Sequence, residues 1–401
     1  MSPPVIQTEL LIVTEHFAPS TGATAQLITD LAQALAAQGR PLTVLTATSG
    51  DPIHGLAVKR FDVRFALADP RALGGKAMRG VVFLLQVLFW GLRHGRRGQR
   101  LLIVSNPPFA GLVGLPLRWL RGMQYVFVLQ DLFPRSAVLA GVLPERSMIT
   151  KSLRWLMHQV CSQSHATVVL SEAMAECWRR ETQATLPLDV IPNWALEQAT
   201  PIAKAHNPLA LKWGLADHFT LQYSGNFGRL HDISTLLEAA RLLATEPVHL
   251  LFIGGGAQRP LVEACVNDPA FPNLRLEHYQ PRERLALSLG VCDLAAIALI
   301  PGAEETMAPC KFYGILASGR GVVLVARSGC DLARLILAED CGIVVEPGDA
   351  WGLAHQLSQL SQDPDRVTAM GERARALYER RFGLERSLAA YEALLYDPYR
   401  P

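Results

Sequence analysis

The chain has 401 residues, of which half are hydrophobic and 18% are charged, and its formal net charge is +2. This length exceeds one ordinary core and predicts two domains of roughly 200 residues, while the composition excludes a disordered chain. The seven cysteines have no CxxC or metal-like spacing, which predicts reduced thiols in a cytosolic protein.

The first half alternates between apolar strands and helices. Residues 10–17 and 41–47 are predicted strands on either side of a helix at 24–39, in which leucines recur at four-residue spacing. The first strand has no basic residues ahead of it, so we do not expect a signal peptide. Further strands are expected in RLLIVSNPP, QYVFVLQDLFP, ATVVLS and LDVIPN. This order predicts a parallel sheet covered by helices, with ligands at the carboxyl ends of its strands.

Polar side chains at these strand ends are the first candidate site residues. Glu15 and His16 follow the first strand, and Gln130 and Asp131 end the strand that begins at residue 124. Asp131 can orient a hydroxyl of a substrate or accept its proton. Alternatively, it caps the turn that DLFP forms.

A window without acids lies between Asp69 and Asp131, where nine Arg or Lys residues occur. It also holds the apolar run GVVFLLQVLFWGL (80–92), shorter than the ~18–20 residues of a membrane span. Basic flanks around such a run are typical of a helix that lies in the surface of an anionic membrane. The alternative is a buried helix with solvated basic ends. Nucleic-acid binding is disfavoured, because the apolar residues form a block and do not alternate with the basic ones.

The second half restarts the strand–helix pattern after VIPNWAL. In YSGNFGRLHD, the residues Gly225, Asn226 and Arg229 lie between a strand and a helix. Small residues let the backbone approach a ligand, helix N-termini attract anions, and an Arg can pair with a diphosphate. The alternative is a tight turn with a surface Arg. A second loop, FIGGGAQRP, contains Gly254, and its favoured interpretation is glycines that pack a helix against the sheet. It lacks the NAD-binding fingerprint.

Further along, TMAPCKFYGILASG predicts a helix with Pro309 and Lys311 in its first turn. A cation there opposes the helix dipole, and an anionic ligand would reverse that penalty. Three candidate phosphate sites at one sheet edge favour a diphosphate ligand.

Five segments, taken in order, resemble a family. EHFAPSTGATAQLITDLAQALAAQG, VIPNWA, YSGNFGRLHDISTLLEAARLL, LLFIGGG and APCKFYGILASGRGVVLV are similar to family-4 retaining glycosyltransferases of the GT-B fold. The resemblance covers nearly the whole chain and is nearest to bacterial enzymes of the L-fucosamine-transferase type, which build cell-surface polysaccharides.

The resemblance implies two Rossmann-like α/β domains that face each other across a cleft. We expect an acceptor domain at 1–195 with a basic membrane-facing segment at 71–121, a donor domain at 196–380, and a last helix at 381–401 that crosses back. It also implies no metal and no cofactor. The expected donor is a nucleoside-diphosphate sugar, with UDP favoured, and the expected acceptor is a polyprenyl-diphosphate-linked saccharide at the cytoplasmic membrane face.

Site residues follow from the same resemblance. Expected catalytic residues are Asp131, Gln130 and His16. Expected donor-binding residues are Gly22, Gly225, Asn226, Arg229, Gly254, Glu304, Glu305, Thr306, Met307, Ala308 and Lys311.

Two departures from the family pattern matter. His231 and Asp232 stand where a second cation of the Gly-rich loop is usual, so Lys311 is expected to supply that charge. Gly314 stands where relatives carry a ribose-binding Glu, so ribose must be held differently. Two alternatives stay open: a non-hydrolysing nucleotide-sugar epimerase and a non-catalytic partner subunit.

Overall fold

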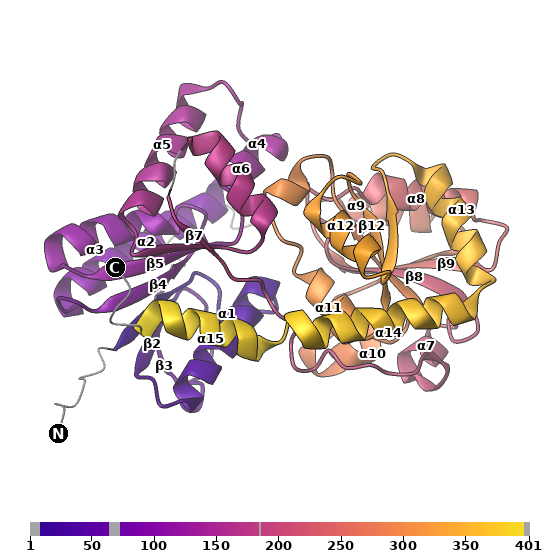
Figure 1. The fold of residues 1–401 in the computed structure, drawn as a ribbon, viewed down its shortest axis with the longest axis horizontal. Coiled ribbons are helices and arrows are strands. Elements are labelled where there is room, and N and C mark those ends of the chain that lie inside the picture. The colour runs from indigo at the N-terminus through magenta and orange to yellow at the C-terminus, as the bar shows by residue number, and fades with distance from the viewer. Residues whose placement is uncertain (1–8, 64–72, 184–185, 397–401) are drawn as a thin grey trace. The chain divides into compact units, whose positions relative to one another are not determined.

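The chain forms two compact units in a computed structural model that describes residues 9–63, 73–183 and 186–396 (Figure 1). The first unit contains the described residues up to Pro192, the short segment Thr306–Ala308, and the chain from Leu384 onward. The second contains Asn193–Glu305 and Pro309–Gly383. Each unit has its own hydrophobic core.

The first unit is built on a seven-stranded parallel sheet in the order β3-β2-β1-β4-β5-β6-β7. Its strands are β1 (Leu10–Val13), β2 (Leu42–Thr46), β3 (Ala57–Arg60), β4 (Arg100–Val104), β5 (Gln124–Leu129), β6 (Ala166–Val169) and β7 (Leu188–Val190). Central strands such as β1 are buried along their whole length, as expected for apolar runs covered by helices on both faces.

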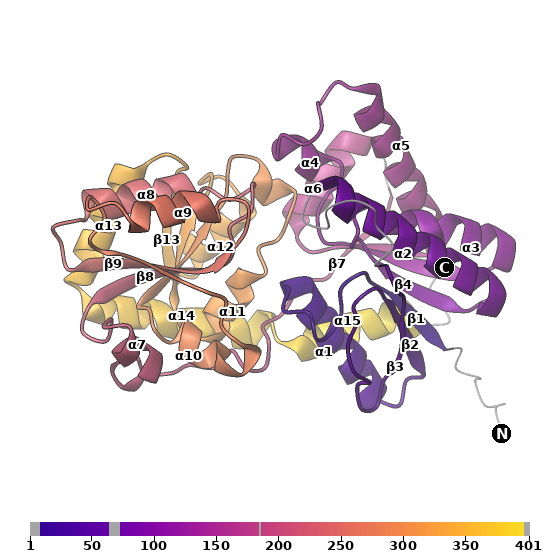
Figure 2. The ribbon, with the colours of Figure 1, turned by 180° about the vertical axis from the view of Figure 1, so that it is seen from behind.

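Helices flank this sheet on both faces (Figure 2). They are α1 (Ala23–Ala37), α2 (Leu73–His94), α3 (Gly114–Arg121), α4 (Arg135–Leu139), α5 (Met148–Gln163), α6 (Glu172–Thr182) and α15 (Leu384–Tyr396). The helix predicted at 80–92 is therefore part of the longer α2. Within the described parts of the chain, no helix combines the length and hydrophobicity needed to cross a membrane.

The second unit has a six-stranded parallel sheet in the order β10-β9-β8-β11-β12-β13. Its strands are β8 (Phe219–Asn226), β9 (Val248–Gly255), β10 (Leu274–Glu277), β11 (Leu294–Ala298), β12 (Gly321–Val325) and β13 (Gly342–Val345). Its helices are α7 (Pro208–Lys212), α8 (Ile233–Leu242), α9 (Arg259–Val266), α10 (Leu285–Leu289), α11 (Lys311–Ala317), α12 (Asp331–Ala338), α13 (Ala350–Ser361) and α14 (Pro364–Arg381). The predicted α/β class with two parallel sheets is confirmed.

Candidate functional site

The Gly-rich loop after β8 and the start of α11 come together at the carboxyl edge of the second sheet. Gly225 has φ +124°, and a Cβ atom there would lie 3.7 Å from Cε and 3.9 Å from Nζ of Lys311. Lys311 therefore lies against the open backbone of Gly225. Two of the segments that the sequence singled out as phosphate sites thus meet in space.

Lys311 has an unusual environment for a cation. Its Nζ is buried and has no hydrogen-bond partner among the described residues, and it lies 3.6 Å from the centroid of the Tyr223 ring. Burial lowers the pKa of Lys311 from its usual value to about 7. The ring supplies only part of the lost hydration energy. An anion beside Nζ would supply the missing partner. Helix α11 begins at Lys311, two residues later than the predicted start at Pro309. Because α11 has only seven residues, its N-terminus alone does not make an anion site, and the site depends on the Lys311 ammonium group.

His231 and Asp232, which replace the expected second cation, have structural roles. The Nδ1 atom of His231 lies 2.7 Å from both the Tyr223 hydroxyl and the Asn226 carbonyl oxygen. Burial, with Lys311 nearby, lowers the pKa of His231 to about 3, so this ring is neutral. Asp232 is the N-cap of α8 and accepts a hydrogen bond from the backbone N–H of Thr235.

The second glycine-rich loop packs against the first. A Cβ at Gly254 would lie 2.1 Å from the carbonyl oxygen of Gly225, so only glycine allows this approach. Gln258 fixes the arrangement, because its side-chain amide donates to the carbonyl oxygens of Gly228 (2.5 Å) and His231 (2.8 Å). The glycines of this loop thus pack mainly against the neighbouring Gly-rich loop. The sequence had favoured glycines that pack a helix against the sheet. Gln258 was missed, since nothing local marks its role.

Arg229 lies in the same loop as an exposed side chain and makes no ion pair with any described residue. Its expected role in donor binding stays a prediction.

Glu304 and Glu305 lie in a short 3-10 helix (Ala303–Glu305) after β11, and both pair with Arg327. The Arg327–Glu305 distance is 2.7 Å. Glu304 has a side chain only 1% exposed, and its Oε2 atom has no partner among the described residues. A buried carboxylate oxygen without a donor is suited to accept a ligand hydroxyl. Arg327 follows a different strand, β12, so the sequence alone does not link it to these carboxylates.

At Gly314 the structure offers space and no carboxylate. A Cβ there would meet only Leu289 Cδ1, at 3.8 Å. The ribose-binding Glu of the family therefore has no equivalent at this position.

The candidate residues of the first unit also lie at the carboxyl edge of their sheet. His16 is exposed just beyond β1, and the half-buried Gln130 follows β5, where its backbone N–H donates to Ser105 Oγ at 2.8 Å. Strands β1 and β5 are separated by β4 alone, so their ends are about 10 Å apart. Gly22 is exposed at the N-cap of α1.

Asp131 is an exposed residue, although the protein around it removes enough water to raise the pKa of its carboxyl to about 6. The carboxylate accepts no hydrogen bond from a described residue, so it does not cap the following turn. Asp131 forms an isolated antiparallel bridge with Met307, and the backbone N–H of Leu132 donates to the Thr306 carbonyl oxygen at 2.8 Å. Thr306 and Ala308 are buried.

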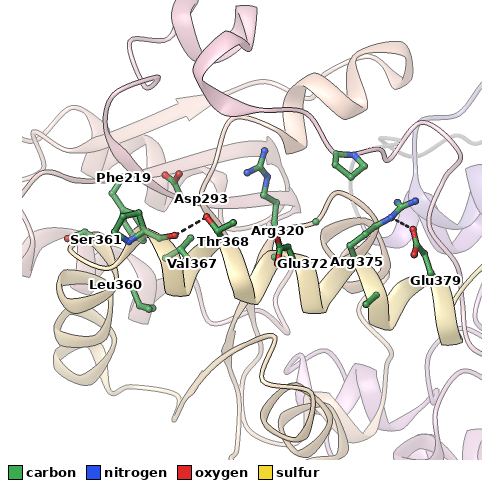
Figure 3. Close-up of a pocket in the computed structure, with 15 residues that line it drawn as sticks. Phe219, Asp293, Arg320, Leu360, Ser361, Val367, Thr368, Glu372, Arg375 and Glu379 are labelled. Carbon is green, nitrogen blue, oxygen red and sulfur yellow. Dashed lines mark hydrogen bonds and ion pairs between the residues drawn. The ribbon is translucent and has the colours of Figure 1, made fainter.

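A cavity of about 500 Å³ lies elsewhere in the second unit (Figure 3). Its lining includes Phe219, Asp293 and Arg320, which stand at or just before the amino ends of β8, β11 and β12. Ligands of parallel α/β sheets bind at the opposite, carboxyl edge. We therefore place the candidate site at the Gly225 loop and Lys311.

Comparisons with known proteins identify the family to which the chain is similar. The Glycosyl transferase 4-like domain matches residues 22–194, and the domain Glycosyl transferases group 1 matches residues 218–363. The chain is 26% identical over 322 residues to the probable glycosyltransferase WbjE of Pseudomonas aeruginosa, which covers 79% of this chain and 80% of that protein.

The fold is shared with solved structures, among them HepE and WaaG. HepE of Anabaena in complex with UDP-glucose has a TM-score of 0.74 at 14% identity, covering 97% of this chain and all of that one. WaaG, a glycosyltransferase involved in lipopolysaccharide biosynthesis, has a TM-score of 0.71 at 15% identity, covering 96% of this chain and all of that one. At these identities the likeness shows the GT-B fold alone.

Proposed function

We propose that this chain, which belongs to the glycosyltransferases that its two matching domains describe, moves a sugar from a nucleoside-diphosphate sugar to a lipid-linked or growing saccharide in bacterial cell-surface polysaccharide synthesis. UDP-sugar is the expected donor, which the UDP-glucose complex of HepE supports by analogy of fold. The donor would bind the second unit and the acceptor the first.

One observation carries the donor assignment. The Lys311 ammonium is buried without a hydrogen-bond partner among the described residues and lies against the Gly225 backbone. A departing nucleoside diphosphate gains negative charge as the glycosidic bond breaks, and a fixed cation at that point stabilises the transition state. Arg229, in the same loop, would bind the diphosphate as a second cation. Glu304 would accept a donor hydroxyl, with Arg327 as its positioning residue.

The acceptor side is proposed from the first unit. Asp131 would orient the acceptor hydroxyl or accept its proton, with Gln130 and His16 at the same edge of the sheet. Retention of the anomeric configuration is proposed from family resemblance, as are a reaction that needs no metal and a location at the inner membrane face.

Membrane association is proposed from α2. Its exposed apolar side chains Met78, Val81, Leu85 and Phe89 follow one another at spacings of three or four residues. These side chains form a single stripe along the helix, and the most exposed of them, Phe89, is 69% exposed. Arg93, Arg96 and Arg97 follow it as exposed cations. The predicted segment 71–121 begins outside the described residues, at Arg71.

The experiment is calorimetric binding of UDP, GDP and UDP-N-acetylhexosamines to the purified chain. We expect UDP to bind and the Lys311→Met and Arg229→Ala variants to bind about 10- to 100-fold more weakly, since a charge-assisted hydrogen bond contributes about 1.5–3 kcal/mol. Lys212→Met, at an exposed lysine of α7, is the matched control. A wild-type chain that is folded and binds no nucleotide would favour the non-catalytic partner.

A further inference from the structure

The structure places a third helix beside the two helices of the basic segment. A Cβ at Gly91 of α2 would lie 2.8 Å from Leu117 of α3, so these helices are in close contact. Trp119 of α3 donates from Nε1 to Gln163 Oε1 at the end of α5, at 2.7 Å. Figures 1 and 2 show α2, α3 and α5 as neighbours in the first unit.

These three helices have a common charge pattern. None contains an Asp or Glu, whereas α1, α6 and α15 each contain at least one. Lys151 and Arg154 give α5 two cations, and Arg154 pairs with Glu145 (3.0 Å) and Glu181 (3.7 Å) from outside the helix. Lys151 is exposed. The acid-free window read from the sequence ends at Asp131, so α5 lies outside it.

Helix α5 also exposes apolar side chains. Met148 is 73% exposed, Ile149 65% and Trp155 61%. Met148 and Trp155 are seven residues apart and therefore lie on one face of the helix, with Lys151 between them. The opposite face, with Met157, Val160 and Cys161, is buried in the core. On α3, Trp119 and Leu120 are exposed as well.

We propose that α5 is a second lipid-contacting helix, so that the surface that binds an anionic bilayer is formed by α2, α3 and α5 together. This rests on the proposed membrane association and extends it to a helix outside the predicted segment. Exposed Met, Ile and Trp side chains next to a lysine suit the interface of a membrane, where Trp sits at headgroup level and Lys contacts phosphate.

The charge pattern favours lipid over a second copy of the chain. A symmetric dimer through this surface would bring cations against cations, with no acid on the three helices to pair with them, and like charges across an interface are costly. An anionic bilayer supplies the complementary charge.

Flotation with vesicles tests the proposal. Phosphatidylcholine vesicles with and without phosphatidylglycerol are mixed with the wild type, with Met148→Asp/Ile149→Asp, and with Lys151→Glu. We expect about tenfold or greater loss of binding to anionic vesicles for the double variant and a smaller loss for Lys151→Glu. Trp351→Asp and Leu337→Asp, at exposed apolar residues of the second unit, are controls that should bind as the wild type does. Unchanged UDP binding and circular dichroism verify that each variant folds.

The outcomes separate the two proposals. If Leu85→Asp/Phe89→Asp loses binding while the α5 variants keep it, the lipid surface ends at α3 and this inference is overturned, but membrane association stands. If the wild type ignores anionic vesicles, both fail. Equal binding to neutral vesicles, or a wild-type dimer that the α5 variants dissociate, would also overturn it.

Discussion

The raised pKa of the Asp131 carboxyl predicts how transfer activity should depend on pH. This carboxyl has a pKa raised to about 6 by loss of water, so the carboxylate form is present above that pH and is lost as the pH falls through it. We expect transfer activity at saturating donor to fall below about pH 6, as an acid limb in a pH–rate profile.

The Asp131→Asn variant tests this assignment. It should be slow at every pH and should lack the acid limb, while its UDP binding by calorimetry stays that of the wild type. A variant with wild-type rate, or with an unchanged acid limb, would remove Asp131 from the reaction.

Alanine substitutions at two glycines, Gly254 and Gly314, are expected to change the free energy of unfolding in opposite directions. Gly254 has φ +133°, and a Cβ there would clash with the Gly225 carbonyl oxygen, so Gly254→Ala must distort the donor loop. We expect it to lower the free energy of unfolding by about 1–3 kcal/mol and to weaken UDP binding.

Gly314→Ala is the matched control, because Gly314 lies inside α11 with room for a methyl group. It should raise the free energy of unfolding by about 0.5–1 kcal/mol. Urea denaturation measures both. A Gly254→Ala chain as stable as the wild type would contradict the tight packing of the two loops.

Local sequence patterns predicted some of the candidate site residues and not others. Lys311 was identifiable because a cation at a helix start is unfavourable without an anion. Gln258 and Arg327 were not, since each acts on a loop that follows another strand and no local pattern signals such a contact. The roles of His231 and Asp232 as loop and helix anchors likewise needed the structure.

At the scale of elements, α2 presents the apolar stripe defined by Met78, Val81, Leu85 and Phe89. Replacing Leu85 and Phe89 by Asp removes apolar area from the stripe and adds negative charge. We expect about tenfold or greater loss of binding to anionic vesicles, with little change in stability because both side chains are exposed.

Two results for the Leu85→Asp/Phe89→Asp variant would contradict lipid contact by the stripe. If this variant binds vesicles as the wild type does, the stripe does not contact lipid. A large drop in its thermal midpoint would show that the stripe belongs to the core, the alternative that the sequence left open for this helix.

The elements differ in how far sequence predicts them. The buried strands were identifiable as continuous apolar runs. Strand β3 was not: its four residues AVKR alternate between exposed and half-buried positions and include two cations, so only pairing with β2 makes it a strand.

At the scale of the whole molecule, the chain's last helix belongs to the first unit. Arg40 forms an ion pair with Glu392 at 3.4 Å, and Ser387 donates to the Pro192 carbonyl oxygen at 2.8 Å. Tyr391, Leu394 and Leu395 of α15 are buried. Truncation after Gly383 should therefore destabilise the first unit selectively.

Calorimetric unfolding verifies this expectation. We expect the truncated chain to lose or lower one thermal transition and to keep a second transition that UDP still raises. Equal loss of both transitions would contradict the division into two separately packed units.

The two-sheet fold was predictable from the repeated strand–helix pattern, because each apolar run marks its strand in the local sequence even though the strand forms only by pairing with distant ones. The division of the chain was harder to place, since Thr306–Ala308 belongs to the first unit although its neighbours on both sides belong to the second. No local pattern encodes such an assignment.

If Lys311 holds the donor's diphosphate, binding of UDP should be accompanied by proton uptake. Burial lowers the pKa of Lys311 to about 7, so near pH 8 most free chains carry a neutral amine, and a bound diphosphate would raise that pKa and recharge it. UDP binding would be measured by calorimetry near pH 8 in buffers of different ionisation enthalpy, for the wild type and Lys311→Met. We expect net proton uptake by the wild type and none by the variant, which should bind more weakly. Tight UDP binding by Lys311→Met with the same proton uptake would contradict it.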